Sequence, residues 1–286
     1  MRQQLLQQRS ALPRRERVAA TDHAVHLSVD YARFAGHLGV ASFSSPLHAS
    51  ELVLRTRVTP QEFRVPLRDV RLSSNHVYPH QLGVCLQPVY FHADWPAYAQ
   101  YLEFWMAAGA TKFYLYVHST TNNVRKILHQ YKAVLGDRLE IVPWSDLPVQ
   151  QRDAGNFYAD PNTRIFSAGG HNALNDCILR ARSDVKFLAV VDLDELLHIK
   201  LSPSVATASA VDVLNNLADE NPLAASFALD WLYVQEKYDT RNVKRLSDVR
   251  FDSLASLRQP IPSTVVQDYV RLKKMIHRPE RVSWQT

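Results

Sequence analysis

Apolar residues recur with two alternating periods from residue 83 onward. Runs of consecutive apolar residues, typical of buried strands, are followed by stretches in which apolar residues return every three or four positions, as on one face of a helix. This alternation predicts an α/β fold with a mostly parallel central sheet and right-handed crossovers. The predicted strands are residues 84–91, 112–117, 138–142, 187–191 and 224–229, and the predicted helices follow Asp94, begin near residues 124 and 169, and cover residues 211–218.

The segment before residue 83 has a different pattern. Residues 51–58 and 63–67 alternate apolar and polar positions, which predicts short antiparallel strands. Residues 1–22 are polar and rich in arginine, as in a flexible solvated lead. We therefore expect a basic lead over residues 1–22, a small β-rich segment over residues 23–82 and an α/β domain over residues 83–286.

The strand predicted at residues 187–191 ends abruptly in carboxylates at Asp192, Asp194 and Glu195. In parallel α/β sheets, ligands gather beyond the carboxyl ends of the strands. Closely spaced carboxylates supply hard oxygen ligands to Mn²⁺ or Mg²⁺, and such a cation neutralises a diphosphate. The motif therefore predicts a metal-dependent nucleotide-sugar site. The alternative is an acidic strand exit that binds nothing.

Composition narrows the possible functions. With 33 basic and 28 acidic residues, the positive charge suits an anionic ligand, but no basic stripe interleaved with aromatic residues indicates nucleic-acid binding. No run approaches the roughly 20 apolar residues that cross a bilayer. Cys85 and Cys177 could form one disulfide, but their places in an apolar strand and a helix favour two buried free thiols.

A series of motifs resembles the family 92 glycosyltransferases. The resemblance covers residues 83–286, and it extends more weakly into the β-rich segment. It implies a GT-A-like fold that binds a nucleotide sugar, located in the Golgi, with a metal-dependent transfer of galactose from UDP-galactose to a glycan or glycoprotein acceptor. The implied acceptor class is the core fucose of N-glycans, and the implied linkage is β. The motifs are residues 85–90 (CLQPVY), 103–109 (EFWMAAG), 113–116 (FYLY), 124–131 (VRKILHQY), 175–177 (NDC), 192–195 (DLDE) and 274–282 (KMIHRPERV).

The sequence departs from this family at both ends. The chain stops at Thr286, whereas the family continues into a segment with a histidine that completes the metal site in many enzymes of this fold. We therefore expect a domain that is truncated at its C-terminal end. The family also implies a single-pass membrane anchor, which this chain does not contain, so we expect membrane association only through an anchor outside it.

Transfer with inversion needs a cation on the leaving diphosphate, a nucleoside pocket and a base for the acceptor hydroxyl. We expect Asp194 to contact the metal, Asp192 to reach the ribose or the metal through water, and Glu195 to bind the metal or orient its neighbours. Tyr90, Phe91 and His92 follow the first strand and could stack on uracil or bond its edge. The alternatives are core packing for Tyr90 and Phe91 and a solvated loop position for His92.

Further candidates come from a helix start and from the C-terminal third of the chain. Gly169 and Gly170 could approach the diphosphate through backbone N–H groups. The resemblance implies that Asn175 and Asp176 help to hold the donor, although Asp176 could instead pair with Arg180. Lys274 matches the lysine of a family motif, and it could neutralise diphosphate charge. The candidate bases are Asp230, ranked first because it ends a strand, followed by Glu236 and Asp239.

Two other functions remain open at this level. A haloacid-dehalogenase-like phosphatase also places Asp-x-Asp after an apolar strand, but Leu196 occupies the position where that class has Thr or Val. A non-catalytic glycan- or nucleotide-binding member of the same fold is the other alternative, because a fold does not fix a function.

Overall fold

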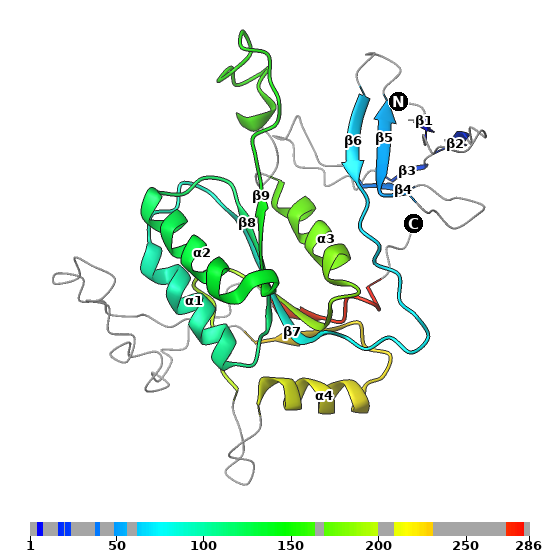
Figure 1. Ribbon diagram of the computed structural model, residues 1–286, viewed down its shortest axis with the longest axis vertical. Coiled ribbons are helices and arrows are strands. Elements are labelled where there is room, and N and C mark those ends of the chain that lie inside the picture. Colours follow the sequence, from blue (N-terminus) through cyan, green and yellow to red (C-terminus); the bar gives the residue numbers. More distant parts are fainter. Residues whose placement is uncertain are drawn as a thin grey trace, which may run out of the picture. The chain divides into compact units, whose positions relative to one another are not determined.

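The computed structural model describes residues 49–55, 62–163, 169–199, 209–230 and 273–282, and the backbone of short strands between residues 5 and 40. Six of its strands form one mixed sheet in the order β11-β12-β10-β7-β8-β9 (Figure 1). The predicted α/β class with a mostly parallel sheet is confirmed. The strands are β7 (His80–Val89), β8 (Lys112–Val117), β9 (Leu139–Pro143), β10 (Val185–Val191), β11 (Ser226–Leu229) and β12 (Lys274–His277).

Five strands of this sheet point the same way, and one is reversed. β10, β7, β8 and β9 are neighbours in parallel ladders. β12 lies antiparallel between β10 and β11, so β11 points the same way as β10. The carboxyl ends of β7, β8, β9, β10 and β11 therefore share one edge of the sheet with the first residue of β12. The sequence analysis did not predict β12.

Helices begin and end where the sequence indicates. α1 (Trp95–Ala107) starts after Asp94 with a proline in its first turn. Gly109 follows its C-terminus with a φ of 98°, a conformation that favours glycine. The predicted helix at residues 211–218 is α4, which carries a reciprocal capping box between Ser209 and Asp212. The remaining helices are α2 (Asn122–Leu135), α3 (Gly170–Ala181) and α4 (Ala210–Glu220).

One face of the sheet packs against α1, α2 and α4. Its strands contribute alternate residues to this core, as the period of two in a strand requires. Three aromatic residues of α1 are buried in this core: Tyr98, Tyr101 and Trp105 are each at most 1% exposed. The strand residues of this core include Leu82, Val84, Leu86, Phe113, Leu115, Leu139, Phe187, Ala189, Val191 and Ile276.

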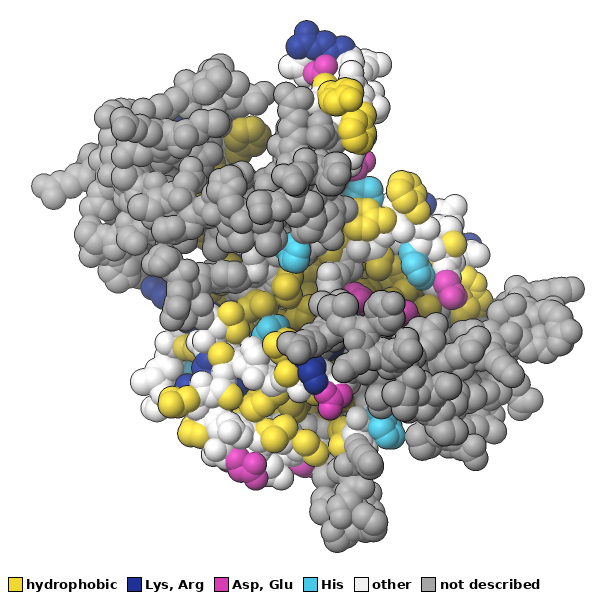
Figure 2. All heavy atoms as spheres, turned by 180° about the vertical axis from the view of Figure 1, so that it is seen from behind, with side chains coloured by type: hydrophobic (Ala, Val, Ile, Leu, Met, Phe, Trp, Pro, Cys, Tyr) yellow, Lys and Arg dark blue, Asp and Glu magenta, His cyan; other side chains and the backbone are white. Residues whose placement is uncertain are grey.

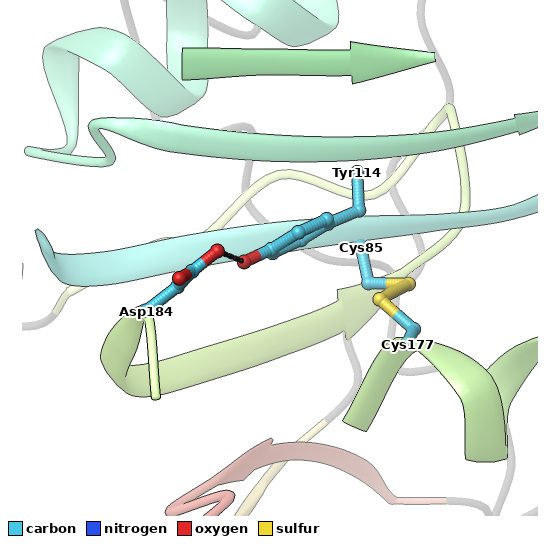
Figure 3. The surroundings of a disulfide bond; sticks show 4 residues. All are labelled: Cys85, Tyr114, Cys177 and Asp184. Carbon is cyan, nitrogen blue, oxygen red and sulfur yellow. Dashed lines mark hydrogen bonds between the residues drawn. A yellow bond between two sulfur atoms is a disulfide. The ribbon is translucent and has the colours of Figure 1, made fainter. Parts of the chain in front are cut away.

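The prediction of two free thiols is wrong. Cys85 on β7 and Cys177 on α3 form a disulfide on the opposite face of the sheet (Figure 3). Beside it, the Tyr114 hydroxyl donates a hydrogen bond of 2.9 Å to the Asp184 carboxylate (Figure 3). The two cysteines are 92 residues apart, so only the return of α3 to the first strand brings their sulfur atoms together. Arg180, from the same helix, pairs with Glu140 at 2.7 Å.

The N-terminal segment is β-rich, as predicted. β5 (Glu51–Arg55) and β6 (Glu62–Pro66) pair antiparallel and continue into β1 (Leu5–Gln7) and β2 (Arg17–Ala19) in a sheet of four strands. β3 (Thr21–His23) and β4 (Leu38–Val40) form a separate antiparallel pair.

The chain divides into two compact units. One comprises Met1–Arg71, Asp146–Asp176 and Trp284–Thr286, and the other comprises Leu72–Ser145 and Cys177–Ser283. The mixed sheet lies in the second unit. The domain limits expected from the sequence stay a prediction. Among the described residues, no helix combines the length and the apolar character that a membrane span requires.

We expect reduction of the disulfide to lower the free energy of unfolding by about 2–4 kcal/mol, because the bond restricts the unfolded chain over a long loop. Denaturant unfolding of the wild type with and without a reducing agent measures this difference. In a Cys85→Ala/Cys177→Ala variant, the reducing agent should change nothing. Free-thiol labelling of the unreduced, unfolded protein would contradict the bond.

A second expectation concerns acid stability. Burial lowers the pKa of His277, whose Nδ1 lies 2.7 Å from the Ser226 hydroxyl oxygen. In the unfolded chain the pKa of His277 is near 6.5, so the unfolded state binds more protons than the folded state. The free energy of unfolding therefore falls as the pH decreases through about 6.5. Urea unfolding between pH 5 and 7 measures this effect. The free energy of unfolding of His277→Gln should change less with pH than that of the wild type. The same substitution at exposed His129 is the matched control for the removal of one histidine.

Candidate active site

A tight acidic turn ends β10. The Glu195 N–H donates to the Asp192 carbonyl at 3.1 Å, and the Asp192 N–H donates to the Glu195 carboxylate at 2.7 Å. These reciprocal bonds hold the turn closed and fix the Glu195 side chain, which is only 14% exposed. Asp194 lies at the exposed tip of the turn.

Lys274, the first residue of β12, is paired with this turn. Its ammonium lies 2.8 Å from Asp192 Oδ2 and 2.9 Å from Glu195 Oε2. The ladder explains the contact, because Val190 is opposite Met275 and the preceding residue of β12 therefore reaches the end of β10. Burial alone would lower the pKa of Lys274, but the hydrogen bonds and charges of both carboxylates raise it above its usual value.

Asp230 belongs to the same edge of the sheet. Leu229 is opposite Lys274 in the β11–β12 ladder, and Asp230 forms an ion pair with Lys273. The hydrogen bond and charge of Lys273 lower the pKa of the Asp230 carboxyl. A general base works best with a pKa near the operating pH, so Asp230 is a weak base while this pair persists. Its catalytic role stays a prediction.

Two α1 side chains interact with the acidic turn. The indole N–H of Trp105 donates to the Glu195 carbonyl at 3.2 Å. Burial and the charges of Asp192 and Glu195 raise the pKa of Tyr101 well above its usual value, so its hydroxyl stays protonated. Among the described residues, that buried hydroxyl has no hydrogen-bond partner. An unpaired buried hydroxyl beside carboxylates is a feature that a bound ligand or water could satisfy.

The end of β7 presents an aromatic side chain in a strained conformation. Phe91 has a φ of 50°, which is rare for a bulky residue, and its side chain is 86% exposed. Its N–H donates to the Ser119 hydroxyl at 2.7 Å, which helps to hold this geometry. Core packing of Phe91, one alternative from the sequence, is therefore wrong. Strain that presents an exposed ring favours a binding role.

The neighbours of Phe91 are partly buried. The Tyr90 ring contacts the ring of His118, which follows β8, at 4.7 Å between centroids and with a tilt of 40°. The His92 ring contacts Tyr98 of α1 at 5.4 Å, and its buried Nδ1 has no hydrogen-bond partner within the described ranges. β7 lies next to β10, with Leu86 opposite Val191, so Tyr90, Phe91 and His92 lie at the same sheet edge as the acidic turn.

The remaining sequence candidates belong to the other compact unit or lie outside the described residues. Gly169, with a φ of 76°, precedes α3, and Gly170, Asn175 and Asp176 lie on its first turns, within the other compact unit. Their contact with a diphosphate stays a prediction. Arg180 forms an ion pair with Glu140, a partner that the sequence did not suggest. Glu236 and Asp239 lie outside the described residues.

The acidic turn presents carboxylate oxygens that a divalent cation could bind. In the described ranges, no three or more His, Cys, Asp or Glu side chains are grouped to hold a metal ion. Asp192 and Glu195 nevertheless both direct an oxygen at one position, which the Lys274 ammonium occupies. Together with the exposed Asp194, they offer the hard oxygen donors that Mn²⁺ and Mg²⁺ prefer, provided that the ammonium moves.

Figure 2 shows one face of the molecule. On its described part, Lys and Arg side chains lie singly among hydrophobic and acidic side chains and do not form a continuous stripe. The expectation that nucleic acid is not a partner stays a prediction.

Sequence reasoning missed the two lysine pairs and the Trp105 bond. β12 has only four residues, and its partners are more than 40 residues away along the chain. The only signal in the sequence was the motif resemblance at residues 274–282, which marked Lys274 but gave it no partner.

The geometry of the turn predicts that Glu195 and Asp194 contribute differently to the free energy of unfolding. Glu195→Ala should lower the free energy of unfolding by about 1–3 kcal/mol, because it leaves the Asp192 N–H without its acceptor and Lys274 with one carboxylate. Asp194→Ala, at the exposed tip, should change it by less than about 0.5 kcal/mol. Urea unfolding measures both variants, and equal losses would contradict this division of roles.

Comparison with known proteins identifies the family of this chain. The model of glycosyltransferase family 92 matches residues 80–284. The glycosyltransferase family 92 protein F13G3.3 of Caenorhabditis elegans is 24% identical over 214 residues, which are 71% of this chain and 41% of the relative. The family 92 protein F55C10.4 of the same organism is 22% identical over 206 residues, 72% of this chain and 36% of the relative. The chain thus spans less than half the length of these curated relatives. Because the family model matches well over half of the chain, including the ends of both β7 and β10, this protein belongs to glycosyltransferase family 92.

Proposed function

We propose that this protein is a metal-dependent glycosyltransferase that moves a hexose from a nucleoside diphosphate sugar to a glycan hydroxyl. The observation that carries the proposal is the pairing of two strand ends within a family 92 domain. The acidic turn of Asp192, Asp194 and Glu195 ends β10, and the exposed Phe91 ring ends the adjacent β7. Ligands of open α/β sheets bind at such strand ends.

The two ends suit different parts of one donor. An exposed, fixed aromatic ring offers a stacking surface for a nucleobase, with Tyr90 and His92 beside it. The acidic turn would hold Mn²⁺ or Mg²⁺, which supplies charge neutralisation at a diphosphate. Lys274 would add a second positive charge there, since its ammonium lies within the same cluster.

In the proposed reaction, the acceptor hydroxyl oxygen attacks the anomeric carbon of the donor sugar. The bond from that carbon to the diphosphate oxygen breaks, and the nucleoside diphosphate leaves with the electron pair. Attack from the opposite side inverts the anomeric configuration. The acceptor proton passes to a carboxylate, for which the candidate at the end of β11 is Asp230 once Lys273 releases it.

The resemblance supplies the finer assignments. It supports UDP-galactose as donor, the core fucose of N-glycans as acceptor class and the Golgi lumen as location, with a membrane anchor outside this chain. The Cys85–Cys177 disulfide suits an oxidising compartment of the secretory pathway. A GT-A-like arrangement would place the nucleotide at the same strand ends.

One alternative function remains, and one is removed. Membership of family 92 replaces the phosphatase hypothesis. A non-catalytic binding module of the same fold would bind the donor without turnover. Slow hydrolysis of a UDP-sugar in the presence of Mn²⁺ would therefore distinguish an enzyme from a binding module.

Calorimetric titration with UDP and UDP-galactose, with and without Mn²⁺, tests the donor site. We expect binding that depends on Mn²⁺ and that Asp194→Ala weakens at least ~10-fold, because this variant removes an exposed metal donor. The matched control is Asp219→Ala, which removes an exposed carboxylate from α4. Equal binding by both variants, or no binding of either nucleotide by the wild type, would contradict the proposal.

A further inference from the structure

Lys274 occupies the position at which two carboxylates of the acidic turn converge. Its ammonium is within 2.9 Å of oxygens from both Asp192 and Glu195, and its side chain is only 28% exposed. An ammonium placed between two carboxylates already supplies a cation to the turn. In the described cluster, it stands where a divalent cation would meet the same oxygens.

The backbone holds Lys274 in this position. β12 is paired on both sides: Met275 lies opposite Val190 of β10, and Lys274 lies opposite Leu229 of β11. The Cα atom of Lys274 is therefore held close to the turn, but its long side chain can rotate. The ammonium can therefore change partners while its backbone stays in the sheet.

Lys274 and a divalent cation compete for the same oxygens. A metal ion that binds Asp192 and Glu195 displaces the ammonium from both, which leaves a partly buried positive charge without a partner, beside a second cation. Both effects oppose binding of the metal alone. A diphosphate removes this cost, because its oxygens can accept hydrogen bonds from the displaced ammonium.

We propose that Lys274 is an internal counter-cation of the acidic turn, and that its transfer from Asp192 and Glu195 to the diphosphate couples binding of the divalent cation to binding of the nucleotide. The coupling part of this inference rests on the proposed function. The free protein thus holds its carboxylates neutralised and in place, and metal and nucleotide bind as a pair. By linkage, each of the two ligands strengthens the other by the same factor.

The first arm of the test omits the nucleotide. Mn²⁺ is titrated calorimetrically into the full chain of the wild type, Lys274→Met and Lys273→Met. Methionine keeps an apolar stem of similar length and removes the charge. We expect Lys274→Met to bind Mn²⁺ at least ~5-fold more tightly than the wild type. Lys273→Met removes the same charge one residue away. Because Lys273 pairs with Asp230 and not with the acidic turn, this variant should gain much less Mn²⁺ affinity.

The second arm repeats the titrations with saturating UDP. In the wild type, UDP should tighten Mn²⁺ binding by roughly 5–150-fold, the usual range of coupling between sites. In Lys274→Met this gain should be several-fold smaller, because no ammonium has to change partners. Lys274→Arg keeps the charge and should retain the weak Mn²⁺ affinity of the nucleotide-free wild type. Circular dichroism and thermal unfolding establish that each variant is folded.

Each outcome has a separate meaning. If Lys274→Met and Lys273→Met gained the same Mn²⁺ affinity, the lower net positive charge alone would explain the gain, and the inference would be overturned. It would also be overturned by Mn²⁺ binding in Lys274→Met that is no tighter than in the wild type, or absent from both. If UDP fails to bind the wild type with Mn²⁺, the proposed function fails, and the nucleotide-free arm still decides whether Lys274 blocks the cation.

Discussion

The parallel pairing of β10 with β7 is the interaction on which the site depends. Its ladder runs from Val185 opposite His80 to Val191 opposite Leu86, through residues that are almost all buried. Because both strands are parallel, their carboxyl ends meet at one edge, and the acidic turn comes next to the aromatic end of β7. The surrounding core makes the register costly to change, since a shift by one residue would exchange the faces of every side chain.

The reversed strand β12 determines the electrostatics of that edge. It inserts between β10 and β11. Its first residue, Lys274, and the preceding Lys273 pair with carboxylates that follow β10 and β11, respectively. A wholly parallel arrangement would present its carboxyl end there instead. The site therefore combines opposite charges that are supplied by distant parts of the chain. Removal of Lys274 or of Glu195 leaves the other as a charge that is partly withdrawn from water.

The opposite face of the sheet is held in another way. α3 is tied to β7 by the Cys85–Cys177 bond and to β9 by the ion pair of Arg180 with Glu140. A covalent link between the first strand and the helix that leads into β10 restrains the two strands that carry the site. An apolar environment accommodates two free thiols as well as a disulfide. Burial of both cysteines therefore did not distinguish the two states, and the prediction of free thiols was wrong.

Apart from β12, the order of strands and helices in the mixed-sheet domain followed from the sequence by itself, as did the acidic end of β10 and the aromatic end of β7. These depend on local periodicity and on residue types that are adjacent in the chain. Helix ends at Asp94 and Gly109 were likewise readable from local chemistry. Only the tertiary structure decided the antiparallel β12, the disulfide, the Trp105 bond and the lysine pairs. Each joins residues far apart in the chain, and no local pattern encodes which distant residue will lie within 3 Å of which. The strained exposure of Phe91 was also a tertiary result, because it depends on the hydroxyl of Ser119 from the next strand end.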